Sequence, residues 1–291
     1  MGNPAVVVTA ALVPTCTAAW LVWGAASAPA DQGRNSDVPQ SVAALPSVRP
    51  SVHPTKAPSR PPRTGRQLAG RVVVLDPGHN PTNNRHTTEI ARKVDIGTAR
   101  KECDTTGTAT NAGYPEASYT LDVSRRVRKL LQDRGATVKL TQDGDRPYGP
   151  CIDERARIGN NAKADAVVSV HADGSAAGNR GYHVILPASV HKGVADTRAI
   201  TKPSRLLGTA LRDHFGDATG TKPSNYIGGG SGLDVRGDLG GLNLSRVPKV
   251  FIECGNMRDP KDAALVSSAA WRQKAAQGIA DGITAYLEGR G

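Results

Sequence analysis

Four short segments of the chain carry side chains that could perform hydrolytic chemistry. They are Asp76-Pro77-Gly78-His79-Asn80, Tyr114-Pro115-Glu116, Ser169-Val170-His171-Ala172-Asp173 and Ile252-Glu253-Cys254-Gly255-Asn256. Together they supply two histidines, a glutamate that can join them as a metal ligand, and a second glutamate. A catalytic zinc ion takes such a ligand set and keeps one position open for water, on which the second carboxylate can act as base. The segments therefore predict a hydrolase with one Zn²⁺.

The elements that must position these side chains follow from the residues next to them. Three of the segments lie at an end of an apolar, β-branched run, over 72–75, 166–170 and 250–252, and the fourth opens a helix-like stretch. The carboxyl ends of parallel strands meet at one edge of a sheet, where α/β proteins build their sites. We therefore expect His79, His171 and Glu253 to lie at the same edge.

The rest of the pattern from residue 71 alternates between strands and helices. We expect strands over 71–76, 136–140, 166–171, 182–186 and 249–253, and helices over 115–134, 152–164, 203–215 and 269–287. Residues 81–113 are polar without clear periodicity and are expected to form a loop or small hairpin near the site. Such alternation predicts a single α/β domain over 69–291, with a mostly parallel, twisted sheet covered by helices on both faces.

The first part of the chain has a different composition. Residues 5–26 are largely apolar and Ala26-Ser27-Ala28 resembles a cleavage site, so we expect residues 1–30 to be a signal peptide, with an uncleaved membrane anchor as the alternative. Residues 31–68 are rich in Pro, Ser and Arg and are expected to be a disordered linker. Both alternatives predict that the remainder is exported, to the periplasm, cell wall or extracellular space.

Export bears on the cysteines. Cys103 and Cys151 lie in loop-like sequence and are the natural disulfide pair in an oxidising compartment. Cys254 directly follows Glu253 on an expected strand, where neighbouring side chains point to opposite faces. If Glu253 faces the site, Cys254 faces the core.

The candidate ligands have alternatives. One histidine after a strand is more often structural than a ligand, but two at two strand ends make a metal site credible. Glu116, in the first turn of a helix, is the best third ligand, ahead of Glu89 and Glu102 in the irregular segment. We expect Glu154 to form an ion pair instead, since arginines follow it closely on a helix.

Glu253 ends an otherwise apolar strand, where a charge is costly unless it is used or paired. Beside a metal-activated water it would serve as the general base and then protonate the leaving group.

The net charge and the composition limit the classes of binding partner. The formal net charge of +11 favours an anionic partner. The chain has two Phe residues and no recognisable nucleic-acid motif, so we expect no nucleic-acid partner and favour an anionic wall or membrane surface.

Other catalytic motifs are missing from the sequence. A His-Glu-x-x-His helix and a Gly-x-Ser-x-Gly elbow are both absent, and the Gly-rich run over 228–232 lacks the Lys of a P-loop. We expect a monomer.

Residues 70–289 resemble the catalytic domain of the zinc-dependent N-acetylmuramoyl-L-alanine amidases. The resemblance rests on the Asp-Pro-Gly-His-Asn turn, Glu116, the Ser-Val-His-Ala-Asp strand end, Gly181, and Pro248 before Val-Phe-Ile-Glu-Cys-Gly-Asn. Gly-Tyr-Pro-Glu over 113–116 and Gly-Leu-Asn-Leu over 241–244 are similar to actinobacterial members without a separate wall-binding module.

The resemblance implies that His79, Glu116 and His171 bind zinc and that Glu253 is catalytic. The implied reaction is hydrolysis of the amide between the lactyl group of N-acetylmuramic acid and L-alanine, in peptidoglycan or muropeptide fragments. The chain departs from many relatives at Asn256, where they have Phe.

Four residues next to the motifs are expected to contact substrate or support the ligands. They are Asn80, Asp173, Asn243 and Asn256. Two alternatives for function stay open: a zinc peptidase that cleaves within the stem peptide, and a non-catalytic wall-binding protein.

Overall fold

The computed structural model describes residues 67–289. The expected signal or anchor over 1–30, and the expected linker up to residue 66, lie outside the described residues. Leu68, which we expected to be part of the linker, is buried in the core, and its backbone N–H donates to the Arg134 carbonyl at 2.8 Å. None of the helices within 67–289 has the length and apolarity needed to span a bilayer.

The described chain alternates strands and helices from β1 to α7. The strands are β1 (Val72–Pro77), β2 (Lys93–Asp95), β3 (Arg100–Glu102), β4 (Thr137–Leu140), β5 (Ala166–Asp173), β6 (His183–Pro187), β7 (His191–Lys192), β8 (Ala195–Asp196), β9 (Leu233–Arg236) and β10 (Lys249–Asn256). The helices are α1 (Thr87–Ile90), α2 (Glu116–Asp133), α3 (Ile152–Asn161), α4 (Thr201–Thr219), α5 (Gly240–Asn243), α6 (Pro260–Ser267) and α7 (Ala269–Leu287), with 3-10 turns η1 (Asn83–Arg85) and η2 (Gly228–Gly230).

The central sheet has the strand order β4-β1-β5-β10-β6-β9. Strands β4, β1, β5 and β10 run parallel, as expected, and their carboxyl ends share one edge. β6 runs antiparallel to β10, and β9 is parallel to β6. The sheet is therefore mostly parallel, with two reversed strands on one side.

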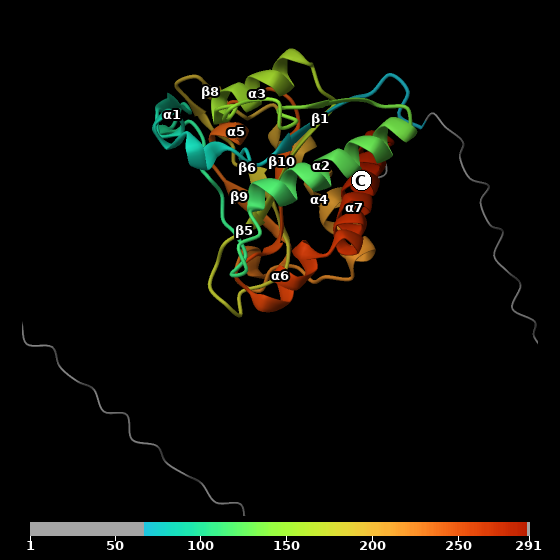
Figure 1. The fold of residues 1–291 in the computed structure, drawn as a ribbon. Helices are drawn as coiled ribbons and strands as arrows, with labels where there is room; N and C mark the ends of the chain where they lie inside the picture. The colour runs from blue at the N-terminus through green and yellow to red at the C-terminus, as the bar shows by residue number, and fades with distance from the viewer. Residues whose placement is uncertain (1–66, 290–291) are drawn as a thin grey trace, which may run out of the picture. The chain divides into compact units, whose positions relative to one another are not determined.

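The two faces of the sheet have different covers (Figure 1). Helices α2, α4 and α7 pack on one face, where alternate strand residues such as Val250, Ile252 and Cys254 form the main core. Helices α3 and α5 lie on the other side with the β2–β3 hairpin. Since neighbouring strand residues face opposite ways, the prediction that Cys254 is a core residue and Glu253 faces the site is consistent with this arrangement.

Several elements differ from expectation. The irregular segment contains the expected small hairpin, β2–β3, but the short α1, α6 and the edge strand β9 were not expected. β9 has only four residues, Leu-Asp-Val-Arg, and two of them are charged, so it lacks the apolar run that marks a buried strand. α4 continues four residues beyond Phe215 and ends at Gly220, whose φ of +69° suits a helix end.

Cys103 and Cys151 form a disulfide, as predicted, across a sequence separation of 48 residues. The bond joins the end of the β2–β3 hairpin to the residue before α3, and both cysteines are buried beside Ile96. Cys254 is a buried free thiol. The disulfide therefore ties the hairpin to the helix that covers the same face of the sheet.

We predict one reactive thiol when a fragment that begins at residue 67 is denatured without reductant and titrated with a thiol reagent. After reduction the same titration should find three, because the fragment contains Cys103, Cys151 and Cys254. Three thiols before reduction would show that the disulfide is absent.

Candidate metal centre

Three side chains that lie far apart in the sequence converge at the strand-end edge of the sheet. His79 follows β1, Glu116 is the first residue of α2, and His171 lies near the end of β5. His79 Nε2 is 3.1 Å from Glu116 Oε2, and His171 Nδ1 is 3.0 Å from Glu116 Oε1. Their ligand atoms all lie within 4.8 Å of one another, so a single metal ion could contact all three.

His79 is held in one orientation by groups around it. Its Nδ1 lies 3.0 Å from the Thr105 carbonyl oxygen and can donate a proton to it, which leaves Nε2 as the nitrogen that faces Glu116 Oε2 and could ligate a metal ion. The backbone of His79 has a φ of +62°, which is uncommon for a residue with a Cβ. Arg155 and Gln142 donate to its carbonyl oxygen at 2.9 and 3.2 Å, which stabilises this conformation.

Glu116 is buried and its oxygens accept backbone hydrogen bonds. The Thr108 N–H donates to Oε2 at 2.9 Å and the Ala172 N–H donates to Oε1 at 3.2 Å. Burial alone would raise the pKa of Glu116, but His79 and His171 outweigh it and hold the pKa below its usual range. The carboxylate is therefore ionised and oriented, as a metal ligand must be.

Two glycines make room for the rings. A Cβ at Gly78 would collide with the His171 imidazole. At Gly107, where φ is +75°, a Cβ would lie 2.7 Å from His79 Cδ2 and 2.8 Å from Glu116 Oε2. The cluster is thus enclosed by backbone that approaches more closely than any side chain would permit.

Beneath this cluster lies a buried ionic network centred on Asp76, the last residue but one of β1. Asp76 accepts hydrogen bonds from Lys249 Nζ at 2.8 Å and Arg155 Nη1 at 2.9 Å. Thr141 and Ser169 hydroxyls donate to it at 2.7 and 3.0 Å. Burial would raise the pKa of Asp76, but Lys249 and Arg155 hold it well below its usual range.

Arg155 extends the network to the metal ligands. Besides Asp76, its guanidinium donates to Asp104 Oδ2 at 2.9 Å and to the Pro77 carbonyl at 2.6 Å. Asp104 precedes Thr105, whose carbonyl orients His79. Two cations and two carboxylates therefore compensate one another and fix both the turn that carries His79 and the segment that orients its ring.

Sequence analysis did not assign functional roles to Arg155, Lys249 or Asp104. A signal was present: Asp76 ends an apolar strand and Lys249 opens another, and buried charges need partners. The sequence contains many arginines, however, and nothing in its spacing selects Arg155 as the partner.

Glu253 lies on β10 directly opposite His171 on β5 in the register of the sheet. Its Oε2 is buried and has no hydrogen-bond partner among the described residues. Burial, together with the carboxylates of Glu116 and Asp173, raises the pKa of Glu253 well above its usual range. A cation bound at the cluster would oppose this effect and favour the carboxylate.

Asn80 and Asn243 serve neighbouring loops in this structure. The Asn80 amide donates to the Gly149 carbonyl at 3.0 Å, and the Asn243 amide donates to the Gly237 carbonyl at 2.9 Å and to Thr98 Oγ1 at 3.0 Å. Both are buried and neither contacts the three candidate ligands through a side-chain hydrogen bond. Their geometry fits support of the loops around the site.

Asp173 and Asn256 lie at the ends of β5 and β10. Asp173 Oδ2 accepts the Tyr226 hydroxyl at 2.8 Å and is close enough to Glu253 to raise its pKa. The Asn256 amide donates to the carbonyls of Ala176 and Asn179 at 3.0 and 2.6 Å. Asn256 thus holds the connection between β5 and β6.

The three glutamates that were not favoured as metal ligands over Glu116 have other partners. Glu89 lies 3.2 Å from His86, and Glu102 lies 3.0 Å from Lys93 on the neighbouring hairpin strand. Glu154 lies 3.7 Å from Arg157, as expected, but its shorter ion pair, at 3.0 Å, is with Arg146, and Arg155 pairs with Asp76 and Asp104 instead.

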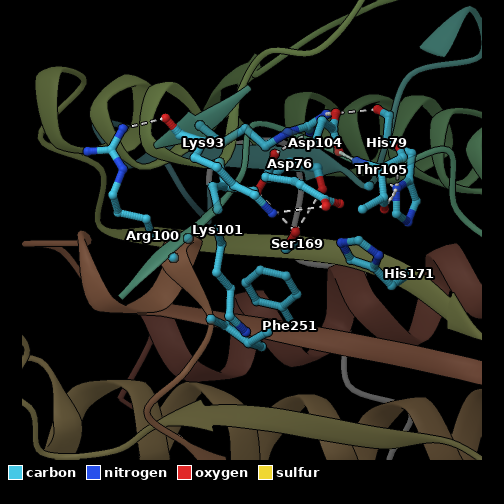
Figure 2. A pocket seen from close by; sticks show the side chains of 17 residues that line it. Asp76, His79, Lys93, Arg100, Lys101, Asp104, Thr105, Ser169, His171 and Phe251 are labelled. Atoms are coloured by element: carbon cyan, nitrogen blue, oxygen red, sulfur yellow. Dashed lines mark hydrogen bonds and ion pairs between the residues drawn. The ribbon is translucent and has the colours of Figure 1, made fainter. Parts of the chain in front are cut away.

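A pocket of about 410 Å³ opens beside the cluster. His79, His171 and Phe251 line its inner side, and the His171 and Phe251 rings stack with centroids 5.1 Å apart (Figure 2). Lys93, Arg100 and Lys101 of the hairpin line the pocket as well. A substrate could reach the two histidines through this opening.

A mostly parallel α/β sheet that gathers two histidines, a ligand carboxylate and a second glutamate at one edge has the construction of a hydrolase that binds a metal ion. Comparison with known proteins supports this class. Residues 73–285 match the family model described as N-acetylmuramoyl-L-alanine amidase. The chain therefore belongs to the N-acetylmuramoyl-L-alanine amidase family, which hydrolyses the amide bond between N-acetylmuramic acid and L-alanine.

Individual relatives agree with this assignment. Over 229 residues the chain is 39% identical to the N-acetylmuramoyl-L-alanine amidase Rv3717 of Mycobacterium tuberculosis. The aligned region covers 78% of this chain and 91% of that protein. The crystal structure of the amidase Ami1 from Mycobacterium smegmatis has a TM-score of 0.70 and 41% identity, over 76% of this chain and 98% of that one. The apo form of Ami1 from Mycobacterium abscessus has a TM-score of 0.70 and 42% identity, over 76% of this chain and 100% of that one.

We predict that Arg155→Gln lowers the free energy of unfolding by about 3–5 kcal/mol, because it leaves Asp76 and Asp104 buried with too little positive charge. Chemical denaturation measures the change. The control is Arg157→Gln on the same helix, where the exposed side chain lies 3.7 Å from Glu154 and the expected change is within about 0.5 kcal/mol. Equal effects of the two substitutions would contradict the role of the network.

Proposed function

We propose that this chain binds one Zn²⁺ through His79, Glu116 and His171 and hydrolyses the amide between the lactyl group of N-acetylmuramic acid and L-alanine, with Glu253 as general base. The observation that carries the proposal is the convergence of the three ligand atoms within 4.8 Å, with Glu253 opposite His171 on the adjacent strand.

The donor set fits zinc. Two imidazole nitrogens and one carboxylate oxygen are the protein ligands of many hydrolytic zinc sites, which leave the fourth position for water or substrate. The contact between His79 Nδ1 and the Thr105 carbonyl is the kind of outer hydrogen bond that orients a ligand histidine. The backbone N–H groups on Glu116 orient the carboxylate in the same way.

When bound, zinc would supply a Lewis acid and lower the pKa of a coordinated water toward neutrality. Glu253 would accept a proton from the attacking water on one oxygen of its carboxyl. The same carboxyl would then deliver that proton to the nitrogen of L-alanine as the amide bond breaks. Glu253 thus carries a single proton from nucleophile to leaving group.

The substrate in this proposal is peptidoglycan or its muropeptide fragments. Lys93 and Lys101 beside the pocket pair with Glu102 and Asp238, whereas Arg100 forms no salt bridge with a carboxylate among the described residues and suits an anionic wall component. Residues 1–30 would direct the chain out of the cytoplasm, either as a cleaved signal or as an anchor. Residues 31–68 would link them to a catalytic domain over 69–291 that acts as a monomer.

A zinc peptidase that cleaves within the stem peptide would use the same four residues. Mass spectrometry of digested muropeptides separates the two reactions, because an amidase releases intact stem peptides and leaves the lactyl carboxylate on the glycan. Muramyl peptide and intact sacculi should both be offered, with and without a chelator. Fragments that retain L-alanine on the glycan would reject the amidase reaction.

We predict that Glu253→Ala retains zinc, measured by atomic absorption, and lowers the rate of stem-peptide release by about 10²–10⁴-fold, because only the proton transfer is lost. His171→Ala should lose both zinc and activity. Glu89→Ala is the control, since Glu89 is exposed and, among the described residues, forms a salt bridge with His86 alone. Full activity of Glu253→Ala would reject the mechanism.

A further inference from the structure

His183, at the start of β6, lies in one row with Glu253 and His171. The register pairs Glu253 of β10 with His171 of β5 on one side and with His183 of β6 on the other. Residues that are paired in register face the same side of a sheet, and neighbouring strands are about 4.8 Å apart. Glu253 is therefore flanked by an imidazole on each side.

The two imidazoles differ in their contacts. His171 Nδ1 is 3.0 Å from Glu116, as a member of the candidate metal cluster. His183 is 2% exposed, and its Nδ1 is buried without a hydrogen-bond partner. Unpaired buried polar atoms are rare in native proteins. Here two of them, His183 Nδ1 and Glu253 Oε2, belong to residues paired across adjacent strands.

The surroundings of His183 favour the neutral ring. Burial lowers the pKa of His183, more than the carboxylates of Asp173 and Asp234 raise it, and Arg236 lowers it further. A neutral imidazole has one N–H donor and one acceptor nitrogen. His183 can therefore donate a hydrogen bond to a carboxylate without adding a charge to the site.

Tyr226 restricts the ring of His183. The two rings meet edge to face, with centroids 6.1 Å apart and an interplanar angle of 87°. The Tyr226 hydroxyl donates to Asp173 Oδ2 at 2.8 Å, which anchors the tyrosine and occupies one oxygen of the nearest carboxylate on β5. Glu253, which pairs with His183 in the sheet, is then the carboxylate that still has an oxygen without a hydrogen bond.

We propose that His183 is a positioning residue for Glu253: the two side chains are not hydrogen-bonded to each other in this structure, and when a metal ion is bound the ionised carboxyl accepts a hydrogen bond from His183 Nδ1–H. The bond holds one oxygen of the carboxyl so that the other faces the water and the leaving amine. This inference rests on the proposed role of Glu253 as base. It adds a group from the reversed strand β6 to the machinery at the edge of the sheet.

The test compares three substitutions of His183 in the zinc-loaded protein. His183→Asn places an amide N–H near the position of Nδ1, His183→Gln places one near Nε2, and His183→Leu removes the donor. We expect His183→Leu to lower kcat by about 10- to 100-fold with KM unchanged, the loss typical for an orienting group at a metal site. Asn should restore most of kcat, Gln should not, and zinc content should stay at wild-type level.

Other outcomes would overturn the proposal. They are an unchanged kcat in His183→Leu, a lowered zinc content, or equal rates for the Asn and Gln variants. The Asn and Gln comparison stands even if His183→Leu fails to fold, because both variants are polar and similar in size. His191→Asn, at an exposed histidine on β7, is the control for loss of an imidazole.

A second measurement does not depend on turnover. The ¹⁵N resonance of His183 Nδ1, recorded on the zinc-loaded protein, should move in Glu253→Ala and stay in place in Glu89→Ala. An unmoved resonance in Glu253→Ala would refute the hydrogen bond. Absence of wild-type stem-peptide release would instead reject the amidase reaction, so the two failures are distinguishable.

Discussion

The buried pairing of Asp76 with Arg155 and Lys249 is the interaction on which the rest of the site depends. Asp76 closes β1, Arg155 belongs to α3, and Lys249 opens β10, so one carboxylate ties together three elements. Arg155 also holds the carbonyls of Pro77 and His79 and the carboxylate of Asp104. Because a buried charge without a partner is so unfavourable, these elements can pack together only in the arrangement that presents His79 to Glu116.

Because side chains alternate along each strand, one face of the sheet forms the core and the other carries the site residues. On β10, Val250, Ile252 and Cys254 pack against α2, α4 and α7, while Phe251 and Glu253 face the site. The core can therefore stabilise the strand without contacting the chemistry on its other face. The same rule places His171 and Glu253 side by side, because residues in register on adjacent strands share a face.

The positions of His79, Glu116, His171 and Glu253 at element ends could be predicted, because apolar runs and a helix start are local signals. The parallel strands and the helices α2, α3, α4 and α7 followed from the same periodicity. The direction of β6 could not be predicted, since a short apolar run reads the same in either direction. Arg155 as partner of Asp76 is a contact across 79 residues of sequence, for which spacing holds no information.

Because β6 runs antiparallel to β10, its first residue, and not its last, lies at the edge of the sheet that carries the site. β5 and β10 bring their last residues to the edge of the sheet, whereas β6 brings its first, and so His183 arrives there directly from the segment over 174–182. That segment crosses the end of β10, and the Asn256 amide fastens it through the carbonyls of Ala176 and Asn179. The pairing of β6 with β10 sets how far His183 stands from Glu253, and the connection must be long enough to cross β10. A deletion that made this connection too short would therefore pull His183 out of register with Glu253, whereas an insertion could loop out from the sheet without moving either residue.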